Sequence, residues 1–445
     1  MTATEASAQP DVSRRPSRAS LTSFLASTEI DTRLFGMLLA LGVIWVGFNV
    51  LSGGTFLTPR NIWNLSVQSA ATAVMATGMV LIIVSRNIDL SIGSMLGFVG
   101  YTMAMAQSDW FPRILGIPLD NPIMWVAALA LGIALGAAIG ALQGFIVAYG
   151  GVPAFIVTLG GFLVWRGLIF PYAKGQTISP LDSTFQMIGG NVVGARVGAL
   201  GDLGSWVLGL IVCVGIVYIL IAGRRRRRRY GFPVRPVWAE IVVGGLGCSA
   251  AIVAVWYANS YALPDNVADA YARAHGLAIP PGGHLVIPVG VATPVVILIA
   301  VGLVMTVIAT RRKFGRYVYA IGGNPEAAEL GGINVRRTIM KTFALMGILV
   351  AISAAIQIAR LNGATTNLGV QAELDVIAAA VIGGTSFAGG IGTISGAILG
   401  AVVMQSLRSG MLLLNVDSPT QDIVVGIVLV AAVGLDSYLR RRSTR

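Results

Sequence analysis

Two short polar stretches interrupt the apolar parts of this 445-residue sequence, and their side chains offer hydrogen bonds rather than catalysis. The first contains amide, carboxylate and hydroxyl groups, at Asn87, Asp89, Ser91 and Ser94. The second contains hydroxyls among glycines, at Gly383, Gly384, Thr385 and Ser386. Irregular backbone at membrane depth is tolerated where it lines a cavity, so both stretches are candidates for a polar pathway. Asp89 also fits a solvated turn or a helix N-cap, and both alternatives stay open.

Motifs for the common enzymatic chemistries are absent from the sequence. It has no phosphate-binding loop of the form G-x-x-x-x-G-K-[ST], and neither G-x-S-x-G nor H-E-x-x-H occurs. Cys213 and Cys248 lie in apolar runs, and His275 and His284 lie in one polar loop. We therefore expect no catalytic residues, no disulfide, no metal site and no ATP hydrolysis by this chain alone. An integral membrane enzyme is accordingly the weakest hypothesis.

The composition predicts an all-α, polytopic helical membrane protein. Only 11% of the residues are charged, against roughly 25% in a soluble domain, and the mean hydropathy is +0.79. We expect about ten to twelve transmembrane segments of roughly 20 residues each. The apolar segments are 34–51, 62–84, 90–107, 124–148, 152–172, 204–223, 237–257, 288–310, 342–360, 374–388, 394–414 and 421–439.

Two of these segments could be something other than ordinary spans. Segment 374–388 is short for a full crossing, which predicts either a half-helix or a tilted, buried helix. Segment 34–51 follows a polar stretch at 1–33 that predicts a disordered tail. Because segment 34–51 is longer than the apolar part of most signal peptides, we expect it to be a retained span.

Basic residues predict which ends of the spans face the cytoplasm. With the N-terminus inside and the spans alternating, most of the 31 lysines and arginines fall in cytoplasmic stretches, including a tail at 440–445. The run of arginines from Arg224 to Arg229 then predicts a cytoplasmic anchor facing anionic membrane lipids. No aromatic residues interleave with the run, so we expect no nucleic-acid partner despite the net charge of +12.

Glycines spaced four residues apart predict close packing of helices. One such stripe is formed by Gly132, Gly136, Gly140 and Gly144. On a helix these positions share one face, which allows the backbone of a neighbouring helix to approach in lipid. The spacing recurs from Gly392 to Gly400. These stripes indicate a compact bundle and carry no information about a substrate.

The stretch GGNPEAAELGGINVRR, residues 322–337, predicts a short helix between two apolar runs. Asn324 is a favoured N-cap, Pro325 suits the first helical position and Glu326 complements the helix dipole. Gly331 and Gly332 supply a stop. A helix of about six residues would measure about 9 Å and would be unstable alone in water. We expect the bundle to order it from one side and a soluble partner from the other, although a capped surface turn is the plainer alternative.

Residues 314–337, FGRYVYAIGGNPEAAELGGINVRR, resemble the cytoplasmic loop of permease subunits of bacterial sugar ABC importers, in the ribose and xylose branch. The core E-A-A-x-x-x-G, from Glu326 to Gly332, matches the importer signature of that family. Three further stretches agree, namely I-D-L-S-x-G-S within 85–100, P-A-F-I-x-T-L-G within 150–168 and V-I-G-G-T-S within 379–401. Residues 204–287 depart from the ten-span core of the family by two added spans, and their polybasic run is similar to that of the xylose-type permeases.

The resemblance implies transport that is driven by a separate subunit. In this family the short helix docks into the ATPase and transmits its closure. The coupling residues so implied are Asn324, Pro325, Glu326, Ala327, Ala328, Gly331, Gly332 and Ile333. The resemblance also implies a permease domain at 34–439, with a coupling loop at 311–341, in the bacterial cytoplasmic membrane.

The implied partners are a cytoplasmic ABC ATPase, which would bind ATP and Mg, an extracytoplasmic sugar-binding protein, a second permease copy forming a homodimer, and membrane lipids. The chain itself would be no enzyme and would hold no cofactor.

A neutral sugar, a pentose such as xylose, is the substrate that the resemblance implies. Its pathway needs scattered hydrogen-bond partners and little charge, and the two polar stretches are the candidates. Arg166 and Arg360 are costly within apolar runs, so each is expected to snorkel to an interface or to pair with an acid such as Glu373 or Asp375. The alternative function is an ATP-independent secondary sugar transporter or facilitator.

Overall fold

A computed structural model describes residues 32–194, 196–279 and 285–443. Residues 1–31 of the tail predicted at 1–33, His284 and the last two residues lie outside this range, whereas residues 32 and 33 begin the first described helix. Nine helices in the described ranges are long and apolar enough to cross a membrane. They are α2 (Thr32–Leu51), α3 (Pro59–Val84), α6 (Met124–Gly150), α7 (Ala154–Ala173), α9 (Gly201–Arg229), α10 (Val237–Asn259), α12 (Thr293–Arg311), α15 (Val335–Leu361) and α17 (Ile394–Leu413). The predicted class, a polytopic helical membrane protein, is confirmed.

The other three predicted segments form helices with shorter apolar parts. Segment 90–107 becomes α4 (Ile92–Met105), which continues through a π-helical turn, η1 (Ala106–Trp110), into α5 (Phe111–Leu115). Segment 374–388 becomes α16 (Ala372–Ile382), an 11-residue half-helix. Segment 421–439 lies within α18 (Ser418–Ser443), whose apolar part ends at Ala431, and residues 440–443 continue this helix.

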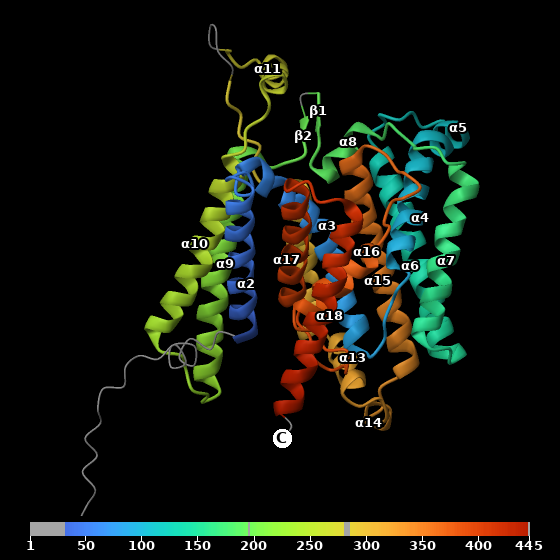
Figure 1. Cartoon of the computed structure of the whole chain (residues 1–445), viewed down its shortest axis with the longest axis vertical. Coiled ribbons are helices and arrows are strands. Elements are labelled where there is room, and N and C mark those ends of the chain that lie inside the picture. The colour runs from blue at the N-terminus through green and yellow to red at the C-terminus, as the bar shows by residue number, and fades with distance from the viewer. Residues whose placement is uncertain (1–31, 195, 280–284, 444–445) are drawn as a thin grey trace, which may run out of the picture.

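The two ends of the helical bundle carry different small elements (Figure 1). One end, here named the α11 end, holds α5, α8 (Ser183–Gln186), η2 (Met187–Gly189) and α11 (Asp265–Ala274). It also holds an antiparallel hairpin of β1 (Val192–Val193) and β2 (Arg196–Val197). The opposite end, here named the α14 end, holds α13 (Lys313–Gly323) and α14 (Pro325–Leu330).

Helices α3 and α15 form the centre of the bundle, where most of their residues are buried. The glycine stripe of α6 faces α15, as expected from its spacing. A Cβ atom at Gly136 would collide with the carbonyl oxygen of Gly347, and one at Gly140 would collide with that of Phe343. The stripe therefore brings two helix backbones into contact, and the predicted packing role is confirmed.

Helices α4 and α16 both begin inside the bundle, where their N-termini meet. Each begins after a non-helical stretch, NIDLS at 87–91 and NLGVQ at 367–371. A Cβ atom at Gly93 would collide with the Glu373 carboxylate, so only glycine fits at this contact. Helix α3 packs against α16 and α17, whereas α15 packs against α4 and α6. This exchange of partners is what an inverted repeat of α3–α4–α6 and α15–α16–α17 produces.

The inserted pair α9 and α10 lies beside this core (Figure 1). Helix α9 continues through the whole arginine run to Arg229, beyond the predicted end of the span at 223. Arg224 forms an ion pair of 2.7 Å with Glu240 of α10, which fastens the two helices together at the end of α9.

Candidate functional site

Helix α14 has the length and the caps that its sequence predicts. The Asn324 side chain accepts a hydrogen bond of 3.0 Å from the backbone N–H of Ala327, and Pro325 occupies the first turn. The helix ends after Leu330, and Gly332 follows with a φ of +81° that favours glycine. The backbone N–H of Ile333 then bonds to the Ala328 carbonyl at 3.0 Å. Local capping chemistry therefore defines this helix at both ends.

The outer face of α14 is open to solvent. Ala328 is buried against the bundle, whereas Glu326, Ala327 and Glu329 are exposed. Leu330 is 91% exposed, more than any other large apolar side chain among the described residues. Within the described ranges, neither glutamate forms an ion pair or a side-chain hydrogen bond. Leu330 was not singled out from the sequence, although an isolated leucine between Glu329 and two glycines was a usable signal.

Helix α13, which precedes α14 in the chain, is fastened to the base of α3. Arg86 donates hydrogen bonds of 2.7 Å from Nε to the Gly322 carbonyl and from Nη2 to the Gly323 carbonyl. These are the last two carbonyls of α13, where a cation also complements the helix dipole. A Cβ atom at Gly322 would collide with the carbonyl oxygen of Val84, the last residue of α3.

The same junction reaches the loop that precedes α17. Tyr319 of α13 donates a hydrogen bond of 2.7 Å to the Gly392 carbonyl. The Gly390 N–H bonds to the Val84 carbonyl at 3.0 Å. The base of α3, the loop before α17 and helix α13 therefore form one bonded unit at the α14 end.

The first polar stretch is buried and bonded to itself. Asp89 is 2% exposed, so the solvated-turn alternative is wrong. Its Oδ1 accepts hydrogen bonds from Ser91, 2.9 Å from the backbone nitrogen and 2.6 Å from Oγ. Ser91 Oγ also lies 3.0 Å from Oε1 of the Gln143 side-chain amide, and Ser94 donates to the Ser91 carbonyl. Asn87 bonds locally to Ser85. These contacts fix the bend before α4, and no sequence pattern pointed to Gln143.

The second polar stretch lies at the α14 end, between α16 and α17. Gly383 and Gly384 border a cavity of about 240 Å³ that is also lined by Tyr319. Ser386 accepts a hydrogen bond from the Ala388 N–H at 3.2 Å, whereas the buried Thr385 hydroxyl has no partner within the described ranges. The structure brings the two stretches together only at their ends, where Arg86 lies against Gly389.

A polar cavity of about 190 Å³ lies between α3, α15 and α17. Its lining residues are Val67, Gln68, Ala71, Thr72, Ile356, Gln357, Arg360, Leu361 and Gln405. Gln405 Nε2 donates to Thr72 Oγ1 at 3.0 Å. Arg360 lies one residue before the end of α15, the end of that helix farther from α14, so the cavity lies towards the α11 end of the bundle.

Sequence reasoning singled out only Arg360 from this cavity. Of the two alternatives for Arg360, pairing with an acid is wrong, because no acid within the described ranges bonds to it; the residue lies in the last turn of α15, at one end of the bundle. The other polar residues were missed, yet their spacing was a signal. Gln68 and Thr72 lie four residues apart on α3, and Gln357 and Arg360 lie three apart on α15, so each pair shares a helix face. No local pattern places the two pairs side by side.

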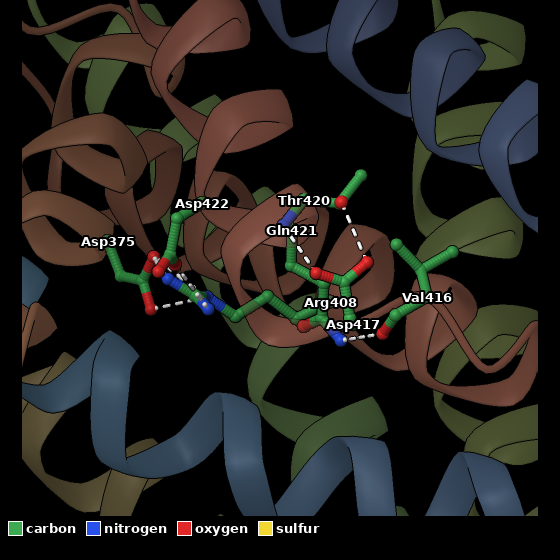
Figure 2. A network of polar contacts seen from close by, with 7 residues as sticks. All are labelled: Asp375, Arg408, Val416, Asp417, Thr420, Gln421 and Asp422. Carbon is green, nitrogen blue, oxygen red and sulfur yellow. Dashed lines mark hydrogen bonds and ion pairs between the residues drawn. The ribbon is translucent and has the colours of Figure 1, made fainter.

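Two other arginines, Arg408 and Arg166, have structural partners, and Figure 2 draws those of Arg408. Arg408 of α17 pairs with Asp375 of α16 through Nε–Oδ2 and Nη2–Oδ1 distances of 2.8 and 2.9 Å. It also lies 3.5 Å from Asp422 of α18. Asp375 is therefore bound by Arg408 rather than by Arg166 or Arg360. Arg166 instead donates to the carbonyls of Thr366 and Leu368, in the non-helical stretch before α16.

The turn before α18 and the first turn of that helix contain further hydrogen bonds, which Figure 2 also draws. Thr420 donates a hydrogen bond of 2.7 Å to Asp417 Oδ1. This bond lowers the pKa of the Asp417 carboxyl. Gln421 donates to the Val416 carbonyl at 2.9 Å. The contacts fix the start of α18 against α17 and provide no reactive group.

Groups of three or more potential metal ligands do not occur among the described residues. Cys213 and Cys248 are free thiols on α9 and α10. The geometry thus offers a helix with an unoccupied outer face at one end and a polar cavity towards the other.

Comparison with known proteins gives one family and several relatives. Residues 61–433 match the family model described as "Branched-chain amino acid transport system / permease component". The xylose transport system permease protein of Escherichia coli (strain K12) is 39% identical over 94% of this chain and 95% of its own length. The corresponding protein of Haemophilus influenzae is 36% identical over 93% of this chain and 98% of its own. The ribose import permease protein of E. coli (strain K12) is 32% identical over 86% of this chain and 87% of its own. No solved structure is significantly similar to the chain.

Proposed function

We propose that this chain, which belongs to the branched-chain amino acid transport system / permease component family, carries a pentose such as xylose across the membrane. It is a permease subunit of a sugar ABC importer, it resides in the inner membrane, and the ATPase of the importer is a separate subunit. The observation that carries the sugar assignment is the 39% identity to a xylose permease over 94% of the chain. A ribose permease is less similar, at 32% identity over 86% of the chain.

The family implies two kinds of partner, an ATPase and a periplasmic sugar-binding protein. We propose that ATP and Mg bind to the ATPase alone, since this sequence lacks a phosphate-binding loop. We also propose that two copies of the permease form a homodimer. The inverted repeat of helices α4 and α16 supports a moving core in each copy, since such repeats commonly underlie alternating access.

The α14 end is proposed to face the cytoplasm. Exposed basic residues gather around α13 and α14, namely Arg311, Arg312, Lys313, Arg316, Arg336 and Arg337. The positive-inside rule associates such clusters with the cytoplasmic side. The arginine run at the end of α9 is proposed to lie on the same side and to bind anionic lipids.

Helix α14 is proposed as the handle through which the ATPase acts on the permease. Glu326, Ala327 and Leu330 would enter the ATPase surface, while Ala328 holds the helix to the bundle. Asn324, Pro325, Gly331, Gly332 and Ile333 would set its length and direction. A pull on α14 would reach α3 and α17 through the Arg86 and Tyr319 bonds, and it would reach α15 directly along the chain.

The proposed pathway runs through the polar cavity and then past the two polar stretches. Below Thr72, every residue of α3 as far as Val84 is buried, so α3 is tightly packed between the cavity and the α14 end. Asn87, Asp89, Ser91 and Ser94 are proposed to fix the shape of the pathway. Gly383, Gly384, Thr385 and Ser386 are proposed to border its cytoplasmic exit.

Reconstitution of the permease with its ATPase and its sugar-binding protein tests this function. We expect uptake of labelled xylose that depends on ATP. The Glu326→Lys variant should insert into the membrane and lose uptake, because the charge on the outer face of α14 is reversed. Normal uptake by this variant would refute the coupling role. Uptake that persists in ATP-depleted vesicles would instead identify a secondary transporter.

A further inference from the structure

We propose that the polar cavity between α3, α15 and α17 is a binding site for one pentose inside each permease subunit. Arg360 and the amides of Gln68, Gln357 and Gln405 would bind the sugar hydroxyls. This inference rests on the proposed function, to which it adds the residues that contact the substrate.

Three polar side chains of the cavity have unused hydrogen-bonding capacity. Gln68, Gln357 and Arg360 are half-buried, and within the described ranges their side chains form no hydrogen bond or ion pair. Polar groups at membrane depth are costly unless they are paired. Two other arginines of the bundle, Arg408 and Arg166, do have partners. The three free side chains therefore indicate a ligand that enters and leaves.

The side chains that line the cavity have a chemistry that suits a sugar. Arg360 provides a planar fork of donors, which suits two neighbouring oxygens of one molecule. Each glutamine amide provides both donors and an acceptor. Gln405 is held by Thr72 through its Nε2 atom, which leaves its Oε1 atom available to accept. A neutral sugar, whose hydroxyls donate and accept, satisfies this combination.

The cavity has a size and a position that suit a transported sugar. The cavity of about 190 Å³ is smaller than the roughly 300–1,000 Å³ pockets of drug-sized ligands, which suits a single small sugar. Its walls come from three helices with different attachments at the α14 end. Helices α3 and α17 are fastened to α13, whereas α15 follows α14 in the chain. A movement of α14 would change the spacing of the walls and release the sugar.

Cysteine protection tests the location of the site. In a complex with its ATPase, with Cys213→Ser and Cys248→Ser as background, a polar thiol reagent is added to Gln68→Cys. We expect D-xylose to slow this modification at least about threefold. Ser66→Cys is the matched control, because Ser66 lies two residues away on α3 and lines a separate apolar cavity. Equal rates with and without sugar at Gln68→Cys, or equal slowing at both positions, would overturn the proposal.

A sugar acid is the competing ligand for a free arginine. D-xylonate is therefore tested beside D-xylose, and stronger protection by the acid would overturn the assignment of a neutral sugar. The protection assay needs no transport, so absence of ATP-dependent uptake in the unmodified complex would refute the proposed function separately.

The Arg360→Lys variant tests the contact itself. It keeps the charge and loses the fork, so we expect a KM for xylose uptake about tenfold higher, with ATPase activity and complex assembly retained. Arg60→Lys, at the same end of the bundle and outside the cavity, should leave uptake unchanged. An unchanged KM in Arg360→Lys would overturn the role of Arg360.

Discussion

The α14 end and the polar cavity use polar groups in opposite ways. At the α14 end, Arg86, Tyr319 and Asn324 are each bonded to a defined backbone atom. In the cavity, Gln68, Gln357 and Arg360 are left without partners within the described ranges. A junction that transmits force needs a single rigid geometry. A site that exchanges ligands needs groups whose bonds are completed only when the ligand is present.

The α14 end and the polar cavity also differ in how tightly their residues are packed. Gly322 lies so close to Val84 that no side chain fits between α13 and α3, whereas the cavity leaves open volume between α3 and α15. We therefore expect substitutions at the α14 end to disrupt the coupling of ATP hydrolysis to transport, because they change the geometry of the contacts there. Substitutions in the cavity should change affinity while the fold persists.

Gly322→Ala should have the largest effect. Its Cβ would collide with the Val84 carbonyl, and overpacking of this kind costs about 1–3 kcal/mol. We expect ATP-driven xylose uptake to fall about a hundredfold in the reconstituted complex. Gly323→Ala is the matched control, since nothing lies within 4 Å of its Cβ position. Equal uptake in the two variants would show that the tight contact between Gly322 and Val84 is not needed for coupled transport.

Arg86→Lys should have the next largest effect. Lysine keeps the charge near the end of α13 but cannot bond Gly322 and Gly323 in the same fork geometry. A lost charge-assisted bond is worth about 1.5–3 kcal/mol, so we expect coupled uptake to fall about tenfold while ATP hydrolysis continues. Arg316→Lys, on the exposed side of α13, should behave as the unmodified protein. Uptake unaffected by Arg86→Lys would show that the fork is dispensable.

The Gln68→Leu variant tests whether the cavity uses its polar groups for binding rather than for stability. Removal of an unpaired amide should raise the melting temperature of the purified permease, because a half-buried polar group without a partner is costly. The same change should lower xylose uptake about fivefold through a higher KM. A fall in melting temperature, or an unchanged KM, would mean that Gln68 has a structural rather than a binding role.

Leu330→Ser should have the smallest effect. The side chain is 91% exposed in the permease, so its loss should leave the stability of the free subunit unchanged. We expect about threefold weaker binding of the ATPase, measured by titration in detergent. Unaltered affinity would remove Leu330 from the proposed contact with the ATPase.

Local chemistry in the sequence was enough to predict α14. Its cap at Asn324, its proline and its two glycines act within a few residues, and the observed helix has the expected length. The apolar runs likewise predicted the spans, because hydropathy needs no knowledge of neighbours. The glycine stripe predicted close packing but not its partner, α15, since a smooth face fits several helices.

Long-range contacts explain what the sequence did not reveal. The meeting of Gly93 with Glu373 joins two stretches about 280 residues apart, and the cavity combines Gln68, Gln357 and Gln405 from three helices. Asp375 forms its ion pair with Arg408 rather than with Arg166 or Arg360, because helix packing places Arg408 beside it. Pairing inside a bundle depends on helix order, which a single sequence does not specify.

The most direct test of the account measures whether α14 moves the walls of the cavity. Spin labels at Arg60→Cys on α3 and Leu361→Cys on α15, in the background without native cysteines, report the distance between α3 and α15 at the α11 end of the bundle. We predict that ATP with vanadate shifts this distance in the complex with an intact α14. The shift should be absent when Glu326→Lys is added. A shift that persists with Glu326→Lys would contradict coupling through α14.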